Sequence, residues 1–332
     1  MLDNKSILLT GGTGSFGKVF TRMVMEKYKL HRLTIYSRDE LKQFDMRNSE
    51  PYRNMANLRF VLGDIRDKER LHRTLDGIDY VVHAAALKQV PAAEINPSEC
   101  VKTNVLGAQN IIDTCLDKGV KRVITLSTDK AANPVNLYGA TKLVADKLFV
   151  AANMYTSEGR CRFSCVRYGN VVGSRGSVIP WFFKLRDTGE ITITDSRMTR
   201  FWITLTQGVD CVLESLQRMQ GGEIFVPKIP SMKVVDLAEV IGPECKLREI
   251  GIRPGEKLHE VMVAEEDSRH THEYDNYFCI YPESYGWLEL QDLRKERKDP
   301  LPDGFRYSSD TNDRWLTKDD MRKMLTDHGY KL

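Results

Sequence analysis

The 332-residue sequence has no hydrophobic run near the roughly 18 residues that would span a bilayer. Its start, Met1 to Lys5, leads into a strand pattern and lacks the apolar core of a signal peptide. It also lacks a basic tail, since 49 lysines and arginines against 46 acidic residues leave a net charge of +3. We therefore expect a cytoplasmic protein that has neither a membrane nor a nucleic acid as partner.

Paired cysteines are missing as well. The seven cysteines are an odd number and contain no Cys-x-x-Cys motif, so we expect reduced thiols. Cys161 and Cys165 are expected on one face of a strand, and the residues around them offer no further metal ligands. We therefore expect no metal site, and the sequence shows no internal repeat.

Short β-rich runs alternate with amphipathic segments through the first half of the chain. This alternation predicts β-α-β units and a Rossmann-type, doubly wound parallel sheet of the α/β class. The expected strands are Ser6 to Thr10, Arg32 to Tyr36, Leu58 to Val61, Tyr80 to His83, Val123 to Leu126 and Arg162 to Tyr168. The expected helices are Phe16 to Tyr28, Asp67 to Leu75, Cys100 to Lys118 and one that carries Tyr138 through Phe149.

A glycine-rich turn follows the first of these strands. Gly11, Gly14 and Gly17 have the spacing G-x-x-G-x-x-G between a strand and a helix. Glycine lets a pyrophosphate approach the backbone, and the helix N-terminus then offers N–H groups to the anion. The order of strand, turn and helix predicts a dinucleotide site.

The residues after the second strand bear on which dinucleotide binds. Ser37, Arg38 and Lys42 can bind a 2′-phosphate, which favours NADP over NAD. The alternative is that Arg38 is a surface residue and Asp39 binds the ribose diol. Asp64, after the third strand, can contact the adenine amine.

After about residue 170 the regularity fades. We expect residues 1–170 to form the cofactor-binding Rossmann domain, with segments near 200–230 returning to it. Residues 171–332 then form a smaller, mainly substrate-binding domain and a C-terminal tail. Expected elements here are a helix from Val178, a strand from Glu190 to Thr194, a helix from Thr206 to Met219 and a strand at Ile224 to Val226. The segment from Glu265 to Pro302 is expected to be polar and irregular, with the charge run Arg294 to Asp299 in a solvated loop.

Leu126 to Lys142 carries the chemistry. Tyr138 and Lys142 lie four residues apart, and a lysine one helical turn away favours phenolate, lowering the pKa of tyrosine from about 10. Tyr138 can then accept the proton of a substrate hydroxyl during its oxidation by the cofactor. For this pair alone, chance spacing in a helix is the competing interpretation.

Asp129 and Lys130 suggest elimination of water in addition to oxidation. After oxidation, the proton beside the new ketone becomes acidic, so a base must remove it and an acid must protonate the leaving hydroxyl. Asp129 suits the acid and Lys130 the base, provided that Lys130 is neutral. Burial near the Lys142 cation and an oxidised nicotinamide would lower the Lys130 pKa from about 10.4. The alternative is a surface Asp-Lys dipeptide in a loop.

These residues carry a resemblance to a known family that covers nearly the whole chain. Further segments contribute to it: Ala84 to Lys88, Arg167 to Ser177, Met198 to Trp202, Gly222 to Pro230 and Ile252 to Glu260. The chain resembles the extended short-chain dehydrogenase/reductase family, and within it the inverting UDP-N-acetylglucosamine 4,6-dehydratases of pseudaminic acid synthesis. Retaining relatives usually carry glutamate where Lys130 stands. One departure is Gln89, where relatives commonly carry histidine.

The resemblance implies roles for individual residues. The catalytic residues are Asp129, Lys130 and Tyr138, with Thr128 and Lys142 in support. The NADP-binding residues are Gly11, Thr13, Gly14, Ser15, Phe16, Gly17, Ser37, Arg38, Asp39, Glu40, Leu41, Lys42, Asp64, Ile65, Ala84, Lys88, Thr103, Asn104, Tyr138, Lys142 and Val171. The substrate-binding residues are Lys88, Asn170, Arg175, Gly176, Ser177, Val178, Ile179, Pro180, Thr194, Met198, Arg200, Arg253 and Glu256. Arg200 and Arg253 suit a UDP diphosphate.

The resemblance also implies a reaction. Tightly bound NADP takes the hydride from carbon 4 of UDP-N-acetylglucosamine, Lys130 removes the carbon 5 proton and Asp129 helps water leave from carbon 6. The hydride returns to carbon 6, carbon 5 is protonated from the opposite face, and the product is UDP-2-acetamido-2,6-dideoxy-beta-L-arabino-hex-4-ulose. This is the first step of pseudaminic acid synthesis for flagellin or surface glycans. Relatives form homo-oligomers that pair through helices near 100–117 and 138–155, and inverting members form hexamers.

Two alternatives remain at this point. One is another UDP-sugar 4,6-dehydratase or a 4-epimerase of the same family. The other is a catalytically idle NADP-binding regulator, which would be expected to lose Tyr138, Lys130 or Asp129.

Overall fold

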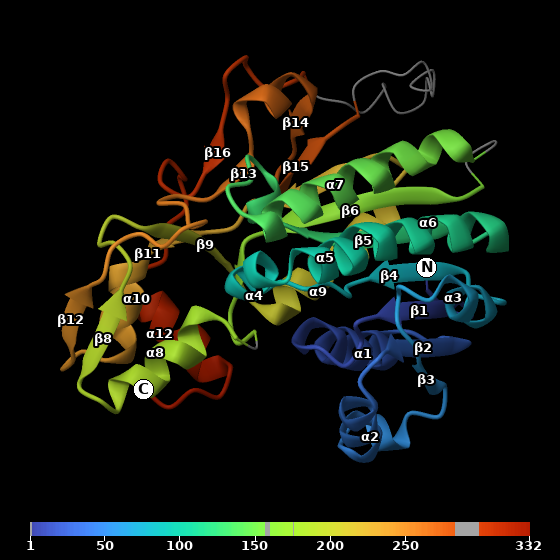
Figure 1. Ribbon diagram of the computed structural model, residues 1–332, viewed down its shortest axis with the longest axis horizontal. Coiled ribbons are helices and arrows are strands. Elements are labelled where there is room, and N and C mark those ends of the chain that lie inside the picture. Colours follow the sequence, from blue (N-terminus) through green and yellow to red (C-terminus); the bar gives the residue numbers. More distant parts are fainter. Residues whose placement is uncertain (1, 157–159, 175, 283–298) are drawn as a thin grey trace.

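A large parallel sheet forms the centre of the computed structural model, which describes residues 2–156, 160–174, 176–282 and 299–332 (Figure 1). Within these ranges the sheet has nine strands in the order β14-β15-β10-β6-β5-β4-β1-β2-β3. The parallel strands are β1 (Ser6–Thr10), β2 (Arg32–Ser37), β3 (Leu58–Leu62), β4 (Tyr80–His83), β5 (Arg122–Thr128), β6 (Arg162–Tyr168) and β10 (Ile224–Pro227). The predicted Rossmann-type α/β fold is confirmed.

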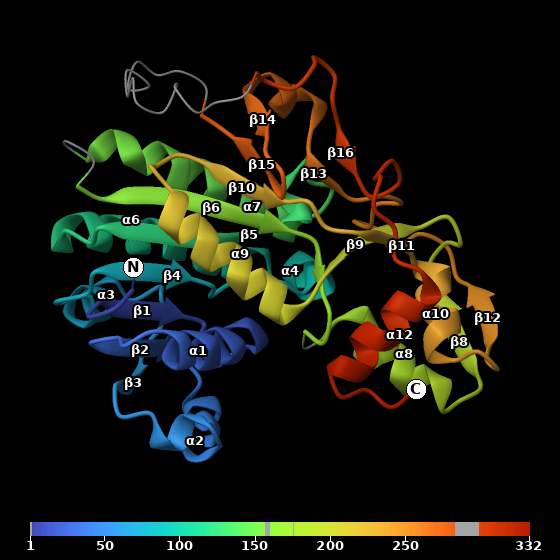
Figure 2. The same cartoon turned by 180° about the vertical axis from the view of Figure 1, so that it is seen from behind.

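Helices cover both faces of this sheet, as expected for parallel strands that are mostly buried along their length. One face carries α6 (Gly107–Lys118) and α7 (Leu137–Ala151), and the other carries α9 (Leu205–Arg218), which packs beside α1 (Ser15–Lys27) (Figures 1 and 2). The remaining helices near the sheet are α2 (Glu40–Asn48), α3 (Lys68–Thr74), α4 (Val90–Ile95) and α5 (Pro97–Val101), with short turns η1 (Tyr52–Asn54), η3 (Asp129–Ala131) and η4 (Ala152–Tyr155). The helix predicted from Cys100 to Lys118 is interrupted by a π-helical segment, η2 (Lys102–Leu106).

A second, smaller group of elements lies beyond the carboxyl ends of the strands (Figure 1). It contains α8 (Val178–Arg186), α10 (Val234–Ile241), α12 (Lys318–Asp327) and the parallel pair β8 (Glu190–Ile193) and β12 (Lys246–Glu249). Strand β9 (Thr199–Ile203) lies between β7 (Asn170–Val171) and β11 (Ser231–Lys233). Its own apolar cluster includes Ile179, Phe182, Trp202, Leu237 and Met321.

Strand β9 separates the two apolar clusters. Phe201 and Ile203 belong to the cluster around the large sheet, whereas Trp202 belongs to the smaller cluster. All three side chains are at most 1% exposed. Successive side chains of a strand point to opposite faces, so β9 contributes one face to each cluster.

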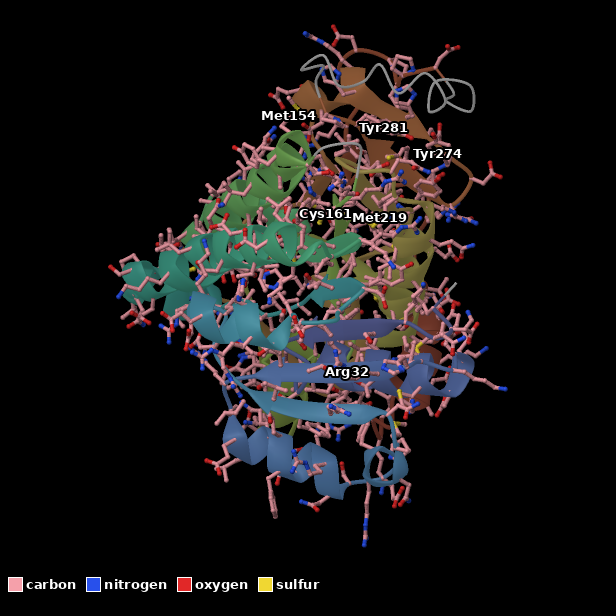
Figure 3. The ribbon with its side chains drawn as sticks, turned by 90° about the vertical axis from the view of Figure 1, so that its right-hand side faces the viewer. Arg32, Met154, Cys161, Met219, Tyr274 and Tyr281 are labelled. Atoms are coloured by element: carbon pink, nitrogen blue, oxygen red, sulfur yellow. The ribbon has the colours of Figure 1, made fainter. Side chains whose placement is uncertain are left out.

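The prediction of an irregular segment from Glu265 to Pro302 was wrong in part. The chain there forms η6 (Glu265–His270), β14 (Thr271–Glu273) and β15 (Tyr277–Ile280), and β15 extends the main sheet antiparallel to β10. Tyr274 and Tyr281 flank β15, and their hydroxyls lie 3.0 Å apart (Figure 3). The apolar run in β15 is short, so the pairing with β10 determines its conformation more than its local sequence.

The charge run predicted as a solvated loop lies outside the described residues except for Asp299, which is exposed. Nearby, β13 (Val261–Val263) pairs with β16 (Tyr307–Ser308). All seven cysteines are free. Among the described helices, none is long and apolar enough to cross a bilayer.

Candidate functional site

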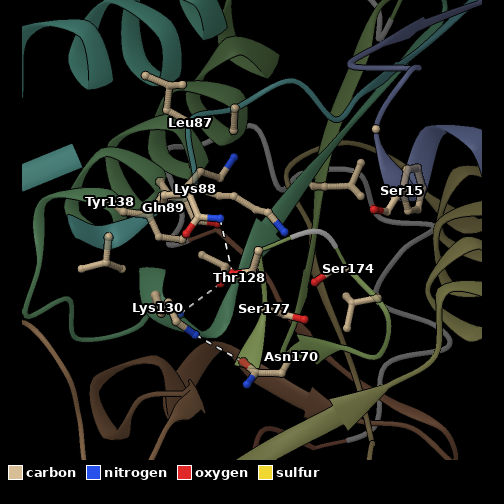
Figure 4. Close-up of a pocket in the computed structure, with 18 of the residues that line it drawn as sticks. Ser15, Leu87, Lys88, Gln89, Thr128, Lys130, Tyr138, Asn170, Ser174 and Ser177 are labelled. Atoms are coloured by element: carbon tan, nitrogen blue, oxygen red, sulfur yellow. Dashed lines mark hydrogen bonds between the residues drawn. The ribbon is translucent and has the colours of Figure 1, made fainter. Parts of the chain in front are cut away.

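A cavity of about 870 Å³ lies where the carboxyl ends of the parallel strands meet the smaller group of elements (Figure 4). Its wall combines the turns after β1 to β5 with residues from the ranges 168–174, 176–182, 192–200 and 253–260. Ligands of doubly wound α/β sheets bind at this edge. The cavity is therefore the candidate site.

The glycine turn forms one end of the cavity. Gly11 has a φ of +65°, and a Cβ there would lie 2.9 Å from the Ala85 backbone. A Cβ on Gly17 would lie 2.4 Å from Gly12, so only glycine allows α1 to start this close to β1. The first turn of α1 carries no acidic side chain. The turn therefore leaves room for a pyrophosphate at a helix N-terminus and suits its charge.

The end of β2 is organised by hydrogen bonds. Ser37 Oγ lies 3.0 Å from Thr13 Oγ1, which joins the turn after β2 to the glycine turn. Asp39 is the N-cap of α2, where its carboxylate accepts from the Lys42 backbone N–H at 3.0 Å and pairs with the Lys42 ammonium. Arg38 lies 3.5 Å from Asp64 and is about half exposed. The Asp39 carboxylate is thus engaged in capping a helix.

The chain between β5 and α7 is fixed by close backbone contacts. A Cβ on Gly139 would lie 2.2 Å from the carbonyl oxygen of Lys130, so the start of α7 packs directly on η3. Asn136 caps α7 through the Gly139 N–H at 2.8 Å, and its amide donates to the Gly255 carbonyl at 2.7 Å. These contacts bring Lys130 and Tyr138 to one wall of the cavity.

Lys130 lies between two carboxylates. Its Nζ is 2.9 Å from Asp129 Oδ1 and 3.3 Å from Glu260 Oε1. It also donates to Asn170 Oδ1 at 3.5 Å (Figure 4). Burial opposes the charge of Lys130, but Asp129 and Glu260 outweigh burial and raise its pKa. Burial near Lys142 and an oxidised nicotinamide was expected to lower the Lys130 pKa, but in the structure Asp129 and Glu260 together raise it, so that direction was wrong for the protein without its cofactor.

Asp129 is fully buried beside Lys130. Its Oδ1 accepts from the Thr128 hydroxyl at 2.9 Å, while its buried Oδ2 has no hydrogen-bond partner among the described residues. Burial raises the pKa of Asp129, as does the Glu260 carboxylate, and both outweigh the Lys130 ammonium. Asp129 is therefore harder to keep ionised than an exposed carboxylate, and the Lys130 ammonium is the group that most opposes its protonation.

Tyr138 and Lys142 both line the cavity from α7. Burial raises the pKa of Tyr138 to about 12, although Lys130 and a hydrogen bond with Thr128 favour phenolate. Burial lowers the pKa of Lys142, and Asp146 one turn further along α7 opposes this. The expected lowering of the Tyr138 pKa by Lys142 was wrong, because burial is the larger effect.

Most residues predicted for the site line the cavity. These are Gly11, Thr13 to Gly17, Ser37 to Asp39, Lys42, Asp64, Ile65, Ala84, Lys88, Thr103, Thr128, Lys130, Tyr138, Lys142, Asn170, Val171, Gly176 to Val178, Thr194, Met198, Arg200, Arg253 and Glu256. Arg175 lies outside the described residues.

Six predicted residues do not reach the described cavity wall: Glu40, Leu41, Asn104, Asp129, Ile179 and Pro180. Leu41 is 75% exposed at the start of α2, whereas Ile179 is fully buried in the smaller apolar cluster. The Asn104 side chain bonds the Leu87 N–H at 2.8 Å and the Leu87 carbonyl at 2.9 Å, so it holds the chain after β4 in place. Asp129 lies behind Thr128 and Lys130.

Two charged residues at the cavity wall, Glu260 and Lys257, were not predicted from the sequence. Glu260 is 2% exposed and lies at the cavity wall together with Lys257 and Arg200. The guanidinium of Arg200 donates to the carbonyls of Thr199, Leu258 and Lys257 at 2.7, 3.1 and 3.0 Å. The available signal was a glutamate next to the apolar strand Val261–Val263, where a charge is unusual unless it has a partner.

The parallel sheet, the glycine turn and the helix with Tyr138 and Lys142 define a protein of the extended short-chain dehydrogenase/reductase type. A family model described as polysaccharide biosynthesis protein matches residues 7–282. The sequence is 53% identical to the UDP-N-acetylglucosamine 4,6-dehydratase (inverting) of Campylobacter jejuni subsp. jejuni serotype O:2 (strain ATCC 700819 / NCTC 11168), over 98% of both chains. The chain belongs to the polysaccharide biosynthesis protein family, and the resemblance inferred from the sequence is confirmed.

Two further relatives define the range of this similarity. The chain is 41% identical to the UDP-glucose 4-epimerase of Rickettsia akari (strain Hartford), over 84% of both chains. The solved structure of Pen from Bacillus thuringiensis superposes with a TM-score of 0.88 at 35% identity and covers 99% of both chains.

Proposed function

We propose that the protein catalyses the NADP-dependent 4,6-dehydration of UDP-N-acetylglucosamine with inversion at carbon 5. The observation that carries the proposal is the Asp129–Lys130 pair, hydrogen-bonded at 2.9 Å beside Tyr138 at the end of β5. The 53% identity to an inverting dehydratase over 98% of the chain supports it. The product is UDP-2-acetamido-2,6-dideoxy-beta-L-arabino-hex-4-ulose, which enters pseudaminic acid synthesis in the cytoplasm.

The glycine turn and the end of β2 hold the cofactor in this proposal. The turn from Gly11 to Gly17 takes the pyrophosphate, and Ser37 and Arg38 take the 2′-phosphate. The capping role of Asp39 favours NADP, because the carboxylate that would bind a free ribose diol already accepts the Lys42 N–H. Bound there, the nicotinamide supplies a hydride acceptor that is restored within each turnover.

Tyr138 accepts the proton of the substrate's 4-hydroxyl as carbon 4 is oxidised. Its raised pKa means that the phenol holds its own proton at neutral pH. The phenol must therefore pass that proton on as it takes another, and the Thr128 hydroxyl, which bonds both Tyr138 and Asp129, offers a route. Lys142 supplies positive charge on the same wall of the cavity.

Lys130 supplies the base of the elimination and Asp129 supplies the acid. The proton that Tyr138 passes on through Thr128 arrives at Asp129 Oδ1 and makes Asp129 a neutral carboxylic acid. Lys130 then no longer faces the Asp129 carboxylate, and its ammonium releases its own proton to solvent to become a neutral amine. The amine then takes the carbon 5 proton, and the acid supplies a proton for the hydroxyl that leaves carbon 6 as water. Because Asp129 lies behind the cavity wall, its proton reaches the substrate through Thr128 or Lys130.

The remaining wall binds the UDP-sugar. Arg253, which is about half exposed, faces the diphosphate, and Arg200 adds positive charge at the wall while its N–H groups stay on backbone carbonyls and Met198. Lys88, Asn170 and Glu256 contact the sugar and the nucleotide. We further propose a division into a cofactor-binding domain of residues 1–170 and a substrate-binding domain of residues 171–332, with a return near 200–230, and a homo-oligomer built from dimers.

The test is incubation of the protein with UDP-N-acetylglucosamine in deuterated water, followed by NMR of the products. The proposal predicts a 4-keto-6-deoxy sugar that carries deuterium at carbon 5 in the L-arabino configuration. A 4-epimerase, the activity named for the Rickettsia akari relative, would give no keto product and leave carbon 5 unlabelled. A D-xylo product would contradict inversion.

A further inference from the structure

Glu260 is a buried carboxylate whose position is set by the backbone around it. It precedes β13, and its N–H donates to Ser309 Oγ at 2.9 Å while its carbonyl accepts from the Ser309 N–H at 2.8 Å. The side chain is 3% exposed and lines the cavity. The pairing of β13 with β16 therefore places this carboxylate against the end of β5.

Cations surround the Glu260 carboxylate. Oε1 lies 3.3 Å from Lys130 Nζ and 3.7 Å from Arg200 Nε, and Oε2 lies 4.0 Å from Lys257 Nζ. Oε2 is buried without a hydrogen-bond partner among the described residues. Burial of such an atom carries a free-energy cost, so a structural role in packing would be served better by a neutral side chain.

The groups facing Lys130 come from several elements. Asp129 belongs to η3, Tyr138 to α7 and Arg200 to β9, and Glu260 precedes β13. Lys88 and Lys257 also interact electrostatically with Lys130, and Asn170 of β7 accepts a hydrogen bond from it. Glu260 and Asp129 are the carboxylates in this set, and they lie on different sides of the Lys130 ammonium in the fold.

We propose that Glu260 is a positioning residue that holds the Lys130 amine at the cavity wall and stabilises its protonated form. This inference rests on the proposed role of Lys130 as the base at carbon 5. Once Lys130 has taken the carbon 5 proton it is an ammonium, and the Glu260 carboxylate at 3.3 Å favours that product of the proton transfer. Without Glu260, Lys130 is a weaker base, and base strength governs the rate of such a transfer.

The decisive measurement is a ¹³C NMR titration of the holoenzyme labelled at the lysine Cε atoms, with the Lys130 signal assigned by its loss in Lys130→Arg. Glu260→Gln keeps the size of the side chain but removes its charge, and we expect it to lower the Lys130 pKa by about one to three units. Glu260→Asp keeps the charge and should retain a higher Lys130 pKa than Glu260→Gln. Glu223→Gln, at a carboxylate that is also 2% exposed but bonds Ser164 and Gly221 instead, is the matched control and should leave the Lys130 signal unchanged.

Kinetics give a second measurement. In Glu260→Gln the acid limb of the kcat–pH profile should move to lower pH by the same increment as the NMR titration, and kcat at its plateau should fall about tenfold or more. A Lys130 pKa that is equal in wild type and Glu260→Gln would overturn the inference. If Glu260→Gln does not fold, Glu260→Asp takes its place in the titration. A Lys130 pKa in Glu260→Asp that is no more than half a unit below the wild-type value supports the charge effect. A Lys130 pKa that falls below the Lys142 pKa overturns it.

The two proposals fail separately. If the wild-type protein does not dehydrate UDP-N-acetylglucosamine, the proposed function is wrong, but the NMR titration still shows whether Glu260 sets the charge of Lys130. If dehydration occurs and Glu260→Gln leaves both the titration and the acid limb unchanged, only the role of Glu260 is wrong.

Discussion

Replacing Lys130 with methionine should remove activity and also destabilise the fold in a pH-dependent way. Methionine keeps the length and most of the volume of the side chain but leaves the Asp129 carboxylate without its cation. Asp129 is fully buried, and its other hydrogen bond comes from the neutral Thr128 hydroxyl. Glu260 retains Arg200 at 3.7 Å and Lys257 at 4.0 Å, so the loss falls mainly on Asp129.

The magnitude follows from the cost of an unpaired buried charge. Removing one partner of a buried ion pair costs about 3 to 5 kcal/mol. In the variant the Asp129 pKa rises far above its unfolded value near 3.9, so the folded state holds a proton that the unfolded state releases. The stability deficit therefore grows as pH rises and shrinks as pH falls, by about 1.4 kcal/mol per pH unit below the new pKa.

Urea unfolding of wild type and Lys130→Met at pH 8 and pH 5.5, in the presence of saturating NADP, measures this difference. We expect a deficit of about 3 kcal/mol at pH 8 that is clearly smaller at pH 5.5. The double variant Asp129→Asn/Lys130→Met is the control, since it removes the unpaired charge and should recover most of the stability without recovering activity. A deficit equal at both pH values would refute the electrostatic reasoning, and normal turnover by Lys130→Met would refute the role of Lys130 as base.

Three further predictions concern the cofactor side of the molecule. Arg38→Asp should lower the preference for NADP over NAD at least about tenfold, because it removes a phosphate partner. Arg59→Asp, on the exposed side of β3, should leave this preference unchanged. If titration finds the same preference in Arg38→Asp as in wild type, the 2′-phosphate argument fails. Gly17→Ala should weaken NADP binding, because the new Cβ would lie 2.4 Å from Gly12. In Gly208→Ala the new Cβ meets nothing within 4 Å, so this variant should bind NADP normally. Equal NADP affinities of the two variants by calorimetry would contradict the close-approach argument. His83 has a pKa lowered to about 3 by burial, so its unfolded form binds a proton below about pH 6.5 that the folded form does not. Stability should therefore fall between pH 6.5 and 4.5 by about 2 to 3 kcal/mol more in wild type than in His83→Gln, and parallel urea curves for the two proteins would show that His83 does not contribute.

Much of the fold could be predicted from the sequence because its first half alternates apolar strands, most of them buried, with amphipathic helices. The strands Ser6–Thr10, Tyr80–His83 and Arg162–Tyr168 were predicted with the bounds that the structure shows. The first two contain consecutive apolar residues, whereas Arg162–Tyr168 interleaves apolar and aromatic residues with Arg162, Ser164 and Arg167. The antiparallel strands β14 and β15 could not be predicted, because β15 is stabilised by pairing with β10, β14 by pairing with β15, and their own sequence contains little periodicity.

The site was predictable where its residues are close in sequence. Thr128, Lys130, Tyr138 and Lys142 come from one strand-to-helix connection, and the structure places all of them at the cavity wall. Glu260 is 130 positions from Lys130, and their approach depends on how β13 and β16 pack. The direction of the Lys130 pKa shift was mispredicted partly for the same reason, since two carboxylates raise this pKa, the adjacent Asp129 and the distant Glu260, and only Asp129 is close in sequence.

The position of β9 between the two apolar clusters has a consequence for cooperativity. Its side chains alternate between the clusters, so neither cluster is complete without the strand that the other one holds in place. Loss of order in the smaller cluster would also remove Phe201 and Ile203 from the larger one. The cofactor and sugar sides of the cavity should therefore melt in a single calorimetric transition, and a ligand that binds on either side should raise the melting temperature of the whole chain.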